Sequence, residues 1–414
     1  MLLEFSVSNF RSIKDKVTLS MVASDLTELS ETNILQDSED VLSVAGIFGP
    51  NSSGKSNIIK AISFMIFFVL NSFGSNSFES NIPIESFVFS TEITPNSPSE
   101  FDIVFSNDSN DIYEYGFTLN HSEILSETLT VNEETVFTRE NQKIHSDENK
   151  ISDHLMKERM TKSNVLYLSI LAATNTEVAT DIVSFFKDKI SIINGASSDI
   201  SWETKNMIDQ DEYKSKIVEA IHGADLYIDD LSLEKADFNV KNFTGAETIP
   251  QEILDQVAKN ALKVKSSHRV YDINGKETGS YSGDISSLES KGTQSFLAVI
   301  GPVIKALSEG TIIFIDEMGA TLHPLMSEHL VKMFMLPDNK KNGQLVFNAN
   351  DSNLLNNKLL RRDQIWFTDK DSSECTSLVP LDSYVHNGKR IRSDVNYAKR
   401  YLSGDFGAIP IFKN

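Results

Sequence analysis

The sequence predicts an α/β fold in which a parallel sheet is flanked by antiparallel strands and interrupted by a helical insertion. A dense apolar run at 41–48 precedes a glycine- and serine-rich loop and an apolar helical stretch, 58–70. A second apolar run, 311–315, ends in two acidic residues. Such dense runs are typical of parallel strands buried on both faces, whereas alternating segments between 101 and 137 are typical of half-buried antiparallel strands.

The remaining elements follow from periodicity. Residues 1–22 alternate and predict two short strands. The segments 101–105, 113–119 and 127–137 predict antiparallel strands, and from 157 to about 221 the pattern becomes helical. Strand and helix character returns from His268 and persists to the end of the chain.

The composition excludes several classes of protein. The chain has 414 residues, a length for about two to three domains. Its formal charge of −21 argues against a generally basic nucleic-acid binder, although a local basic patch is compatible with it. The single cysteine, Cys375, excludes an intrachain disulfide framework and a cysteine-rich zinc site, and it fits a reducing compartment.

No segment predicts a membrane span or a secretory signal. The most apolar run, 62–70, is much shorter than the ~20 residues that a bilayer requires. The first five residues include Glu4 and no basic group. We therefore expect a soluble, cytoplasmic protein that does not bind membranes.

A complete G-x-x-x-x-G-K-[ST] motif lies between the first dense apolar run and the helix that follows it. Glycines let the backbone wrap around phosphate oxygens, and the helix N-terminus favours an anion. Lys55 is expected to reach the β- and γ-phosphates, and Ser56 to ligate Mg²⁺. A chance glycine turn is the alternative, but the flanking strand and helix argue against it. The residues expected to bind nucleotide here are Gly49, Pro50, Asn51, Ser52, Ser53, Gly54, Lys55, Ser56 and Asn57.

The second dense run ends in Asp316 and Glu317. The carboxyl ends of strands in an open α/β sheet are where ligands bind. Asp316 is therefore expected to hold Mg²⁺, and Glu317 to orient or deprotonate an attacking water, which favours hydrolysis over transfer to another acceptor. Solvated acids at a strand end are the alternative.

A third element begins at Ser290, where Ser290-Lys-Gly292-Thr-Gln opens a helical stretch. A serine and glycine at a helix start favour an anion. Alone, this signal indicates only a capped helix.

About 260 residues separate the phosphate loop from the acidic strand, which is much more than in small P-loop kinases and GTPases. We therefore expect residues 1–154 to form the phosphate-loop lobe of one nucleotide-binding head and residues 266–414 to form its C-terminal lobe. Residues 155–265 are expected to form a helical, acidic insertion that projects from the head.

In this order, the three motifs resemble the ABC-type ATPase heads of SMC and recombination proteins. The chain is more similar to the bacterial AAA-type ATPases of the RloA and PARIS AriA kind. The segments that carry the resemblance, besides the motifs above, are Asn9-Phe10-Arg11-Ser12, Glu289-Ser290-x-Gly292-Thr293, Leu322-His323-Pro324, 361–367 and 401–410.

The resemblance implies ATP and Mg²⁺ as cofactors. It implies that Arg11 approaches the nucleotide, and that Ser290 and Gly292 of one subunit close over the γ-phosphate held by another, in a homodimer or larger ring. Members of this group are associated with phage defence, which implies control of a protein effector, a nuclease or toxin encoded nearby.

One departure concerns turnover. The family has a switch histidine after the strand 344–347, where this chain has Asn350. The residues expected to act in catalysis are Lys55, Glu317 and Asn350. Because asparagine carries no positive charge, we expect hydrolysis to be slow. The alternatives are a nucleotide-gated scaffold that hydrolyses almost nothing and an ATP-dependent DNA-repair or end-processing clamp. The net charge and the lack of coiled-coil heptads argue against the clamp.

Overall fold

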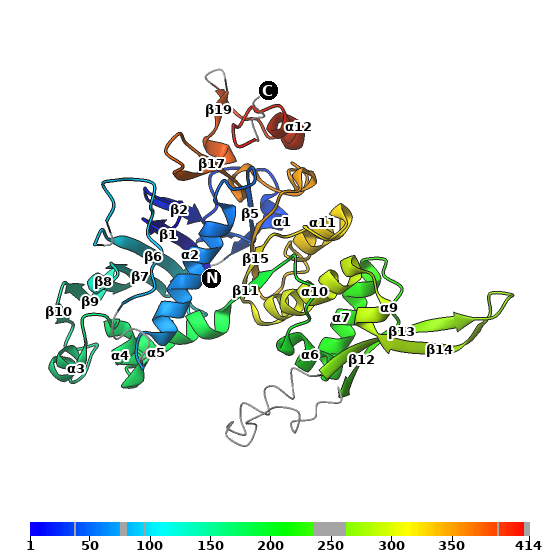
Figure 1. Ribbon diagram of the computed structural model, residues 1–414, viewed down its shortest axis with the longest axis horizontal. Helices are drawn as coiled ribbons and strands as arrows, with labels where there is room; N and C mark the ends of the chain where they lie inside the picture. Colours follow the sequence, from blue (N-terminus) through cyan, green and yellow to red (C-terminus); the bar gives the residue numbers. More distant parts are fainter. Residues whose placement is uncertain (37–38, 75–80, 95, 236–261, 387–388, 410–414) are drawn as a thin grey trace.

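The computed structural model describes residues 1–414 except 37–38, 75–80, 95, 236–261, 387–388 and 410–414. Two large sheets lie on either side of one long helix, α2 (Lys55–Asn71) (Figure 1). The predicted α/β fold with parallel and antiparallel sheets is confirmed. Among the described helices, none is long and apolar enough to span a bilayer.

The central sheet has six strands in the order β11-β15-β16-β5-β17-β18. The first five are parallel, and β18 pairs antiparallel with β17. Alternate residues of β15 face different cores, Phe314 on one side and Ile313 on the other, so the sheet is buried on both faces as the dense apolar runs predict. The strand bounds are Ile190–Asn194 (β11), Ile312–Asp316 (β15), Gln344–Asn348 (β16), Val44–Phe48 (β5), Ile365–Lys370 (β17) and Thr376–Pro380 (β18).

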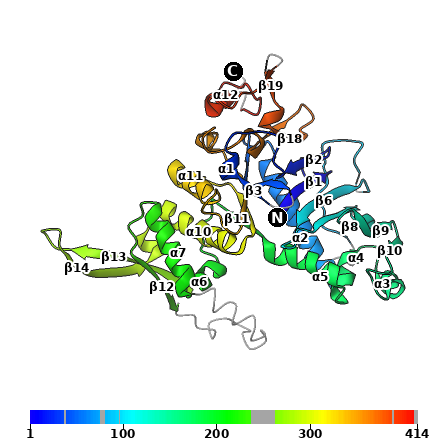
Figure 2. The ribbon, with the colours of Figure 1, turned by 180° about the vertical axis from the view of Figure 1, so that it is seen from behind.

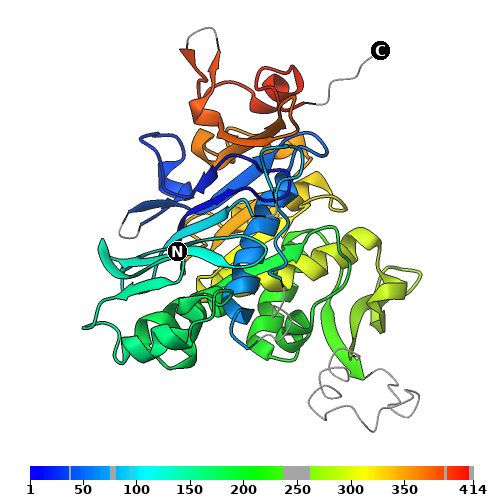
Figure 3. The ribbon, with the colours of Figure 1, turned by 60° about the vertical axis from the view of Figure 1, so that its left-hand side comes forward.

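The second sheet is antiparallel, in the order β10-β9-β8-β7-β6-β1-β2. Its apolar face packs on α2, where the rings of Phe68 and Phe117 lie 5.7 Å apart. Figure 3 shows α2, in blue, between this sheet and the central one. The bounds are Lys143–Ser146 (β10), Glu134–Glu140 (β9), Ile124–Val131 (β8), Ile112–Leu119 (β7), Ser99–Ser106 (β6), Leu2–Ser8 (β1) and Val17–Ser20 (β2).

The other face of the central sheet packs against α10 (Lys291–Glu309) and α11 (Pro324–Met333), which share its second core. Helices α6 (Trp202–Ile208) and α7 (Asp211–Gly223) pack on α10. The short helices are α1 (Ser30–Asn33), α3 (His154–Met160), α4 (Tyr167–Ala173), α5 (Glu177–Ser184), the π-helix η2 (Phe185–Lys189), α9 (Ile285–Leu288) and α12 (Tyr397–Leu402).

A third sheet projects from the α6–α7–α10 layer (Figures 1 and 2). It consists of β12 (Asp230–Lys235), β13 (Leu262–Tyr271) and β14 (Glu277–Asp284) in antiparallel pairing. The remaining small strands are β3 (Ile34–Gln36) with β4 (Asp40–Leu42) and β19 (Val385–His386) with β20 (Lys389–Arg390). The 3₁₀ turns are η5 (Ser352–Leu354), η6 (Arg362–Gln364) and η7 (Leu381–Ser383).

Two predictions about elements need correction. The single strand predicted over 127–137 is a hairpin, because Asn132 and Glu133 adopt positive φ angles of 50° and 66° and reverse the chain. The helical character predicted for 155–265 is present in α3–α7, but this segment also contributes β11 to the central sheet. Residues up to Asn194 are thus part of the head rather than a projection from it, and residues 236–261 lie outside the described residues.

Candidate nucleotide-binding site

The loop predicted to bind phosphate follows β5 and opens α2, and its backbone requires glycine at both ends. Gly49 and Gly54 have φ angles of 153° and 103°. A Cβ on Gly49 would lie 2.4 Å from the carbonyl oxygen of Thr368, and one on Gly54 would lie 2.2 Å from Oγ1 of Thr376. Both threonines come from the β17–β18 hairpin, which therefore packs directly against the loop.

Lys55 is buried and turned back onto its own loop. Its ammonium group donates to the carbonyl oxygens of Gly49 (2.7 Å) and Pro50 (2.9 Å). Burial lowers the pKa of Lys55 to about 8, against the opposing effect of the Asp316 and Glu317 carboxylates. The Lys55 ammonium group therefore lies among carbonyl oxygens of the loop that is predicted to bind phosphate.

Asp316, at the end of β15, accepts two hydrogen bonds on the same oxygen, Oδ1. Ser56 Oγ donates at 2.7 Å, and Asn348 Nδ2 donates at 2.5 Å. Asn348 ends β16, the strand between β15 and β5. The loop, the acidic strand and the strand between them thus meet at one carboxylate.

Glu317 follows Asp316 with a φ angle of 58°, in the left-handed region that non-glycine residues seldom adopt. Its backbone N–H donates to Asn348 Oδ1 at 2.7 Å, and the next N–H, of Met318, donates to the Asn348 carbonyl oxygen at 2.9 Å. This turn places Glu317 at the wall of the cavity in front of the loop.

That cavity has a volume of about 320 Å³. It brings together Lys55, Glu317 and Asn350, the three residues predicted from the sequence to act in catalysis. Its other lining residues are Ser12, Asn51, Ser52, Ser53, Gly54, Ser56, Asn57, Asn348 and Lys370.

Four of the residues that build this site were missed by the sequence analysis: Asn348, Thr368, Lys370 and Thr376. Thr376 Oγ1 lies 2.7 Å from Ser12 Oγ and donates to the carbonyl oxygen of Ser53. The two threonines and Lys370 are placed by the pairing of β17 with β18, which no local pattern reveals. Asn348 carried a signal, because it is polar at the end of a dense apolar run.

Arg11 lies in an adjoining cavity of about 640 Å³, not in the cavity with Lys55. The two cavities share Ser12, Asn57 and Lys370 as lining residues. The guanidinium of Arg11 forms a 2.6 Å ion pair with Glu85. Phe89 is 55% exposed on the wall of this second cavity, with the Lys370 ammonium 5.9 Å from its ring centroid.

Ser290 and Gly292 also stay apart from Lys55 within one chain. Ser290 is exposed and caps α10 by accepting a 3.2 Å hydrogen bond from the Thr293 N–H. A Cβ on Gly292 would lie 3.3 Å from the Thr321 carbonyl oxygen, so this start of the helix packs closely on the loop after Glu317.

Other polar residues singled out by sequence have structural partners. His323 Nδ1 accepts from the Leu325 N–H and caps α11. Arg361 is buried in an ion pair with Asp363, and Arg362 pairs with Glu28.

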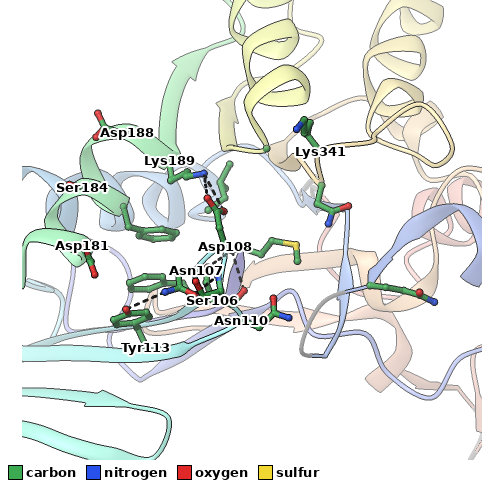
Figure 4. Close-up of a pocket in the computed structure, with 18 residues that line it drawn as sticks. Ser106, Asn107, Asp108, Asn110, Tyr113, Asp181, Ser184, Asp188, Lys189 and Lys341 are labelled. Atoms are coloured by element: carbon green, nitrogen blue, oxygen red, sulfur yellow. Dashed lines mark hydrogen bonds and ion pairs between the residues drawn. The ribbon is translucent and has the colours of Figure 1, made fainter. Parts of the chain in front are cut away.

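A larger cavity, of about 740 Å³, lies at the opposite edge of the central sheet, where β15 begins and Lys341 precedes β16 (Figure 4). Asp108 and Lys189 form a 3.3 Å ion pair across it, and the stacked rings of Phe105 and Tyr113 line it. It has no glycine loop, and it lies away from the carboxyl ends of the strands, where this fold places ligands. We therefore assign the functional site to the smaller cavity at Lys55.

The donor set fits Mg²⁺. Ser56, which lines the cavity, and Asp316, which it contacts, offer hard oxygen atoms 2.7 Å apart, and Mg²⁺ takes one or two such protein ligands together with phosphate oxygens and waters. Among the described residues no group of three His, Cys, Asp or Glu side chains forms a metal cage. A cation here would therefore depend on a nucleotide for its other ligands.

A family model described as "AAA domain, putative AbiEii toxin, Type IV TA system" matches residues 44–159 and 175–354, which is more than half of the chain. No curated protein matches the sequence. Solved structures that are similar include an SMC head domain from Thermotoga maritima, with 13% identity, a TM-score of 0.43, and coverage of 92% of this chain and 98% of that chain. The recombination mediator protein RecF-ATPrS has 14% identity, a TM-score of 0.35, and coverage of 92% and 98%.

Proposed function

Since the chain belongs to this AAA domain family, we propose that it is a Mg²⁺-dependent ATPase that holds ATP between the 49–56 loop and Glu317 and turns it over slowly. The observation that carries the proposal is the contact between Ser56 and Asp316, because Ser56 lines the same cavity as Lys55 and Glu317. Many α/β proteins have a glycine turn, but here the hydroxyl at the end of the loop meets a carboxylate at the end of a parallel strand, and this is the pair that holds Mg²⁺ beside phosphates in P-loop NTPases.

Each residue of the cavity has a distinct role in this proposal. The loop N–H groups and the start of α2 bind phosphate oxygens, and Lys55 exchanges its two carbonyl partners for phosphate. Bound Mg²⁺ would neutralise charge on the phosphates. Glu317, held at the cavity wall, orients a water for attack and accepts its proton.

We expect the nucleoside of the same ATP molecule to bind in the adjoining cavity. It shares three lining residues with the loop cavity and offers Arg11 and the partly exposed ring of Phe89. A base can stack on an aromatic ring of this kind.

Turnover tests the proposal. We expect the wild type to release phosphate from ATP only when Mg²⁺ is present, and we expect Glu317→Gln to bind ATP with unchanged affinity while hydrolysing it about 10²- to 10³-fold more slowly. A wild type that fails to bind ATP in a titration would overturn the proposal.

We further propose that two copies complete each site. Ser290 is exposed at the start of α10 and does not line the cavity with Lys55 in the same chain. In a sandwich dimer, Ser290 and Gly292 of one copy would close over the phosphates held by the other.

Mixed subunits test this arrangement. Lys55→Ala and Ser290→Arg copies should each be inactive alone. When mixed they should regain activity, because a mixed dimer contains one site with an intact lysine loop and an intact serine helix. If mixing restores no activity although the copies associate, the shared site is ruled out.

A second function, a nucleotide-gated scaffold that hydrolyses almost nothing, is favoured by Asn350 on the cavity wall. An amide binds phosphate without supplying positive charge. Under this reading, ATP should stabilise the dimer in the wild type as strongly as in Glu317→Gln. A wild type whose dimer dissociates at the rate of its own ATP hydrolysis would exclude it.

We propose that ATP binding and hydrolysis by this protein control a protein effector in antiviral defence. The family description, which names a toxin and a toxin–antitoxin system, supports a partner encoded nearby. Cells that carry the chain with its neighbouring genes should resist phage, and Lys55→Ala should abolish that resistance. Resistance that survives Lys55→Ala would contradict nucleotide control.

A further inference from the structure

We propose that Asn348 is a positioning residue, which fixes the carboxylate of Asp316 and the backbone of Glu317 through one side-chain amide. The inference rests on the proposed ATPase function and assigns to Asn348 a role that Asn350 does not have. It concerns how the acidic residues are held in place, not contact with the nucleotide itself.

The topology makes Asn348 suited to this role. It ends β16, which lies between β5, the strand before the loop, and β15, the strand that ends in Asp316. Its neighbour on the β5 side is Ile47, two residues before the loop. Asn348 is 1% exposed, so its side chain is fixed by the protein.

Both the nitrogen and the oxygen of the Asn348 side-chain amide form hydrogen bonds. Nδ2 donates to Asp316 Oδ1 at 2.5 Å, and Oδ1 accepts from the Glu317 N–H at 2.7 Å. Only a side chain with a donor and an acceptor side by side makes both bonds. The orientation of the amide is settled by these partners, because the reverse orientation would set its N–H against the N–H of Glu317 and its oxygen against the carboxylate.

The second bond has a consequence for backbone conformation. Glu317 has a φ angle of 58°, which is unfavourable for a residue with a Cβ and persists only where neighbours hold it. Asn348 accepts from two successive N–H groups, from Glu317 with its side chain and from Met318 with its carbonyl oxygen. The strand end of β16 therefore holds the turn that places Glu317 at the cavity wall.

The first bond acts on the same carboxylate oxygen as Ser56. Asn348 and Ser56 both donate to Oδ1 of Asp316, so the rotamer of the proposed metal ligand is set from the end of β16 and from the first turn of α2. Asn350 lines the cavity two residues later, and no hydrogen bond joins it to Asp316 or Glu317 among the described residues. Both asparagines line the cavity, but it is the Asn348 amide that is bonded to Asp316 and Glu317, so holding these two residues is a role of Asn348 and not of Asn350.

Two substitutions of Asn348 test its hydrogen bonds to Asp316 and to the Glu317 N–H. Asn348→Asp keeps the shape and the acceptor for the Glu317 N–H, but sets a carboxylate oxygen against Asp316. Asn348→Leu has a similar size and removes both bonds. Each is compared with the wild type in the full-length protein by thermal melting, by titration of ATP with and without Mg²⁺, and by single-turnover hydrolysis.

We expect Asn348→Leu to bind ATP without Mg²⁺ within about threefold of the wild type, because the loop and Lys55 are untouched. Asn348→Asp adds a negative charge at the cavity wall and should bind metal-free ATP more weakly. We expect both to lose most of the added affinity that Mg²⁺ gives, and to hydrolyse bound ATP about 10- to 100-fold more slowly. A residue that served only packing would change the melting temperature without changing this dependence on Mg²⁺.

Three outcomes would overturn the inference. One is wild-type hydrolysis and Mg²⁺ dependence in both variants. Another is a loss of metal-free ATP binding in an Asn348→Leu variant that still melts cooperatively. The third is a wild type that binds no ATP, which would refute the proposed function itself and so differs from the other two. If Asn348→Leu fails to fold, wild-type hydrolysis and Mg²⁺ dependence in Asn348→Asp alone would overturn the inference.

Discussion

The hydroxyl of Ser56 donates a 2.7 Å hydrogen bond to Oδ1 of Asp316, although the two residues are 260 positions apart in the chain. Parallel strands β5 and β15 are not neighbours, since β16 lies between them. The contact therefore exists only when the lobes before and after the middle segment have folded together. Formation of the site therefore requires that both lobes are folded, because neither lobe can form this contact alone.

Lys55→Ala should abolish ATP binding measurable by titration. The substitution removes the one ammonium group that the loop holds among its carbonyl oxygens. Lys60→Ala is the matched control, because Lys60 lies on the same helix with an exposed side chain. Equal affinity of the two variants for ATP would contradict the role of Lys55.

The affinity for ATP should fall between about pH 7 and 9. Burial lowers the pKa of Lys55 to about 8, so the free protein loses most of this charge across that window, and at pH 9 the affinity should be about tenfold weaker than at pH 7. Titrations at constant ionic strength measure it. Lys55→Arg keeps its charge over this range and should show a flat profile. A wild-type affinity that is constant from pH 7 to 9 would show that the ammonium group does not contact the phosphates.

The same lysine makes a prediction for the free energy of unfolding. The pKa of a lysine is 10.5 without burial, so between pH 8 and 10.5 the unfolded chain binds more protons at this residue than the folded chain. The contribution of Lys55 to stability therefore rises with pH across that window. The difference in unfolding free energy between wild type and Lys55→Met, followed by urea titration from pH 7 to 10, should shift in favour of the wild type.

Gly54→Ala should destabilise the fold by about 2–4 kcal/mol. Its Cβ would collide with Oγ1 of Thr376 at 2.2 Å, at a φ angle of 103°. Gly275→Ala is the control, because Gly275 also has a positive φ, of 76°, but no atom lies within 4 Å of its Cβ position. Similar unfolding free energies for the two variants would show that Thr376 does not constrain the loop.

The central sheet and the principal site residues were within reach of sequence analysis. The motif around Lys55 and the apolar run ending in Asp316 each carry a local pattern with one physical cause, burial of a strand followed by a ligand-binding end. The two dense apolar runs contain β5 and β15, and the predicted helix is α2, each near the predicted bounds.

Elements whose structure depends on distant pairing were not predictable. The short run Ile190–Asn194 is compatible with helix or strand, and its pairing with β15 decides the outcome. The β8–β9 turn uses Asn132-Glu133, which lacks the glycine that marks a tight hairpin. Thr376 reaches the phosphate loop only through the register of β17 with β18.

A structure of the protein with a non-hydrolysable ATP analogue and Mg²⁺ tests the central claim most directly. We predict that the γ-phosphate replaces the Gly49 and Pro50 carbonyl oxygens as the partner of Lys55, with the metal ion on Ser56 and Asp316. A nucleotide bound elsewhere, or a Lys55 that keeps both carbonyl contacts while the nucleotide is present, would contradict the account.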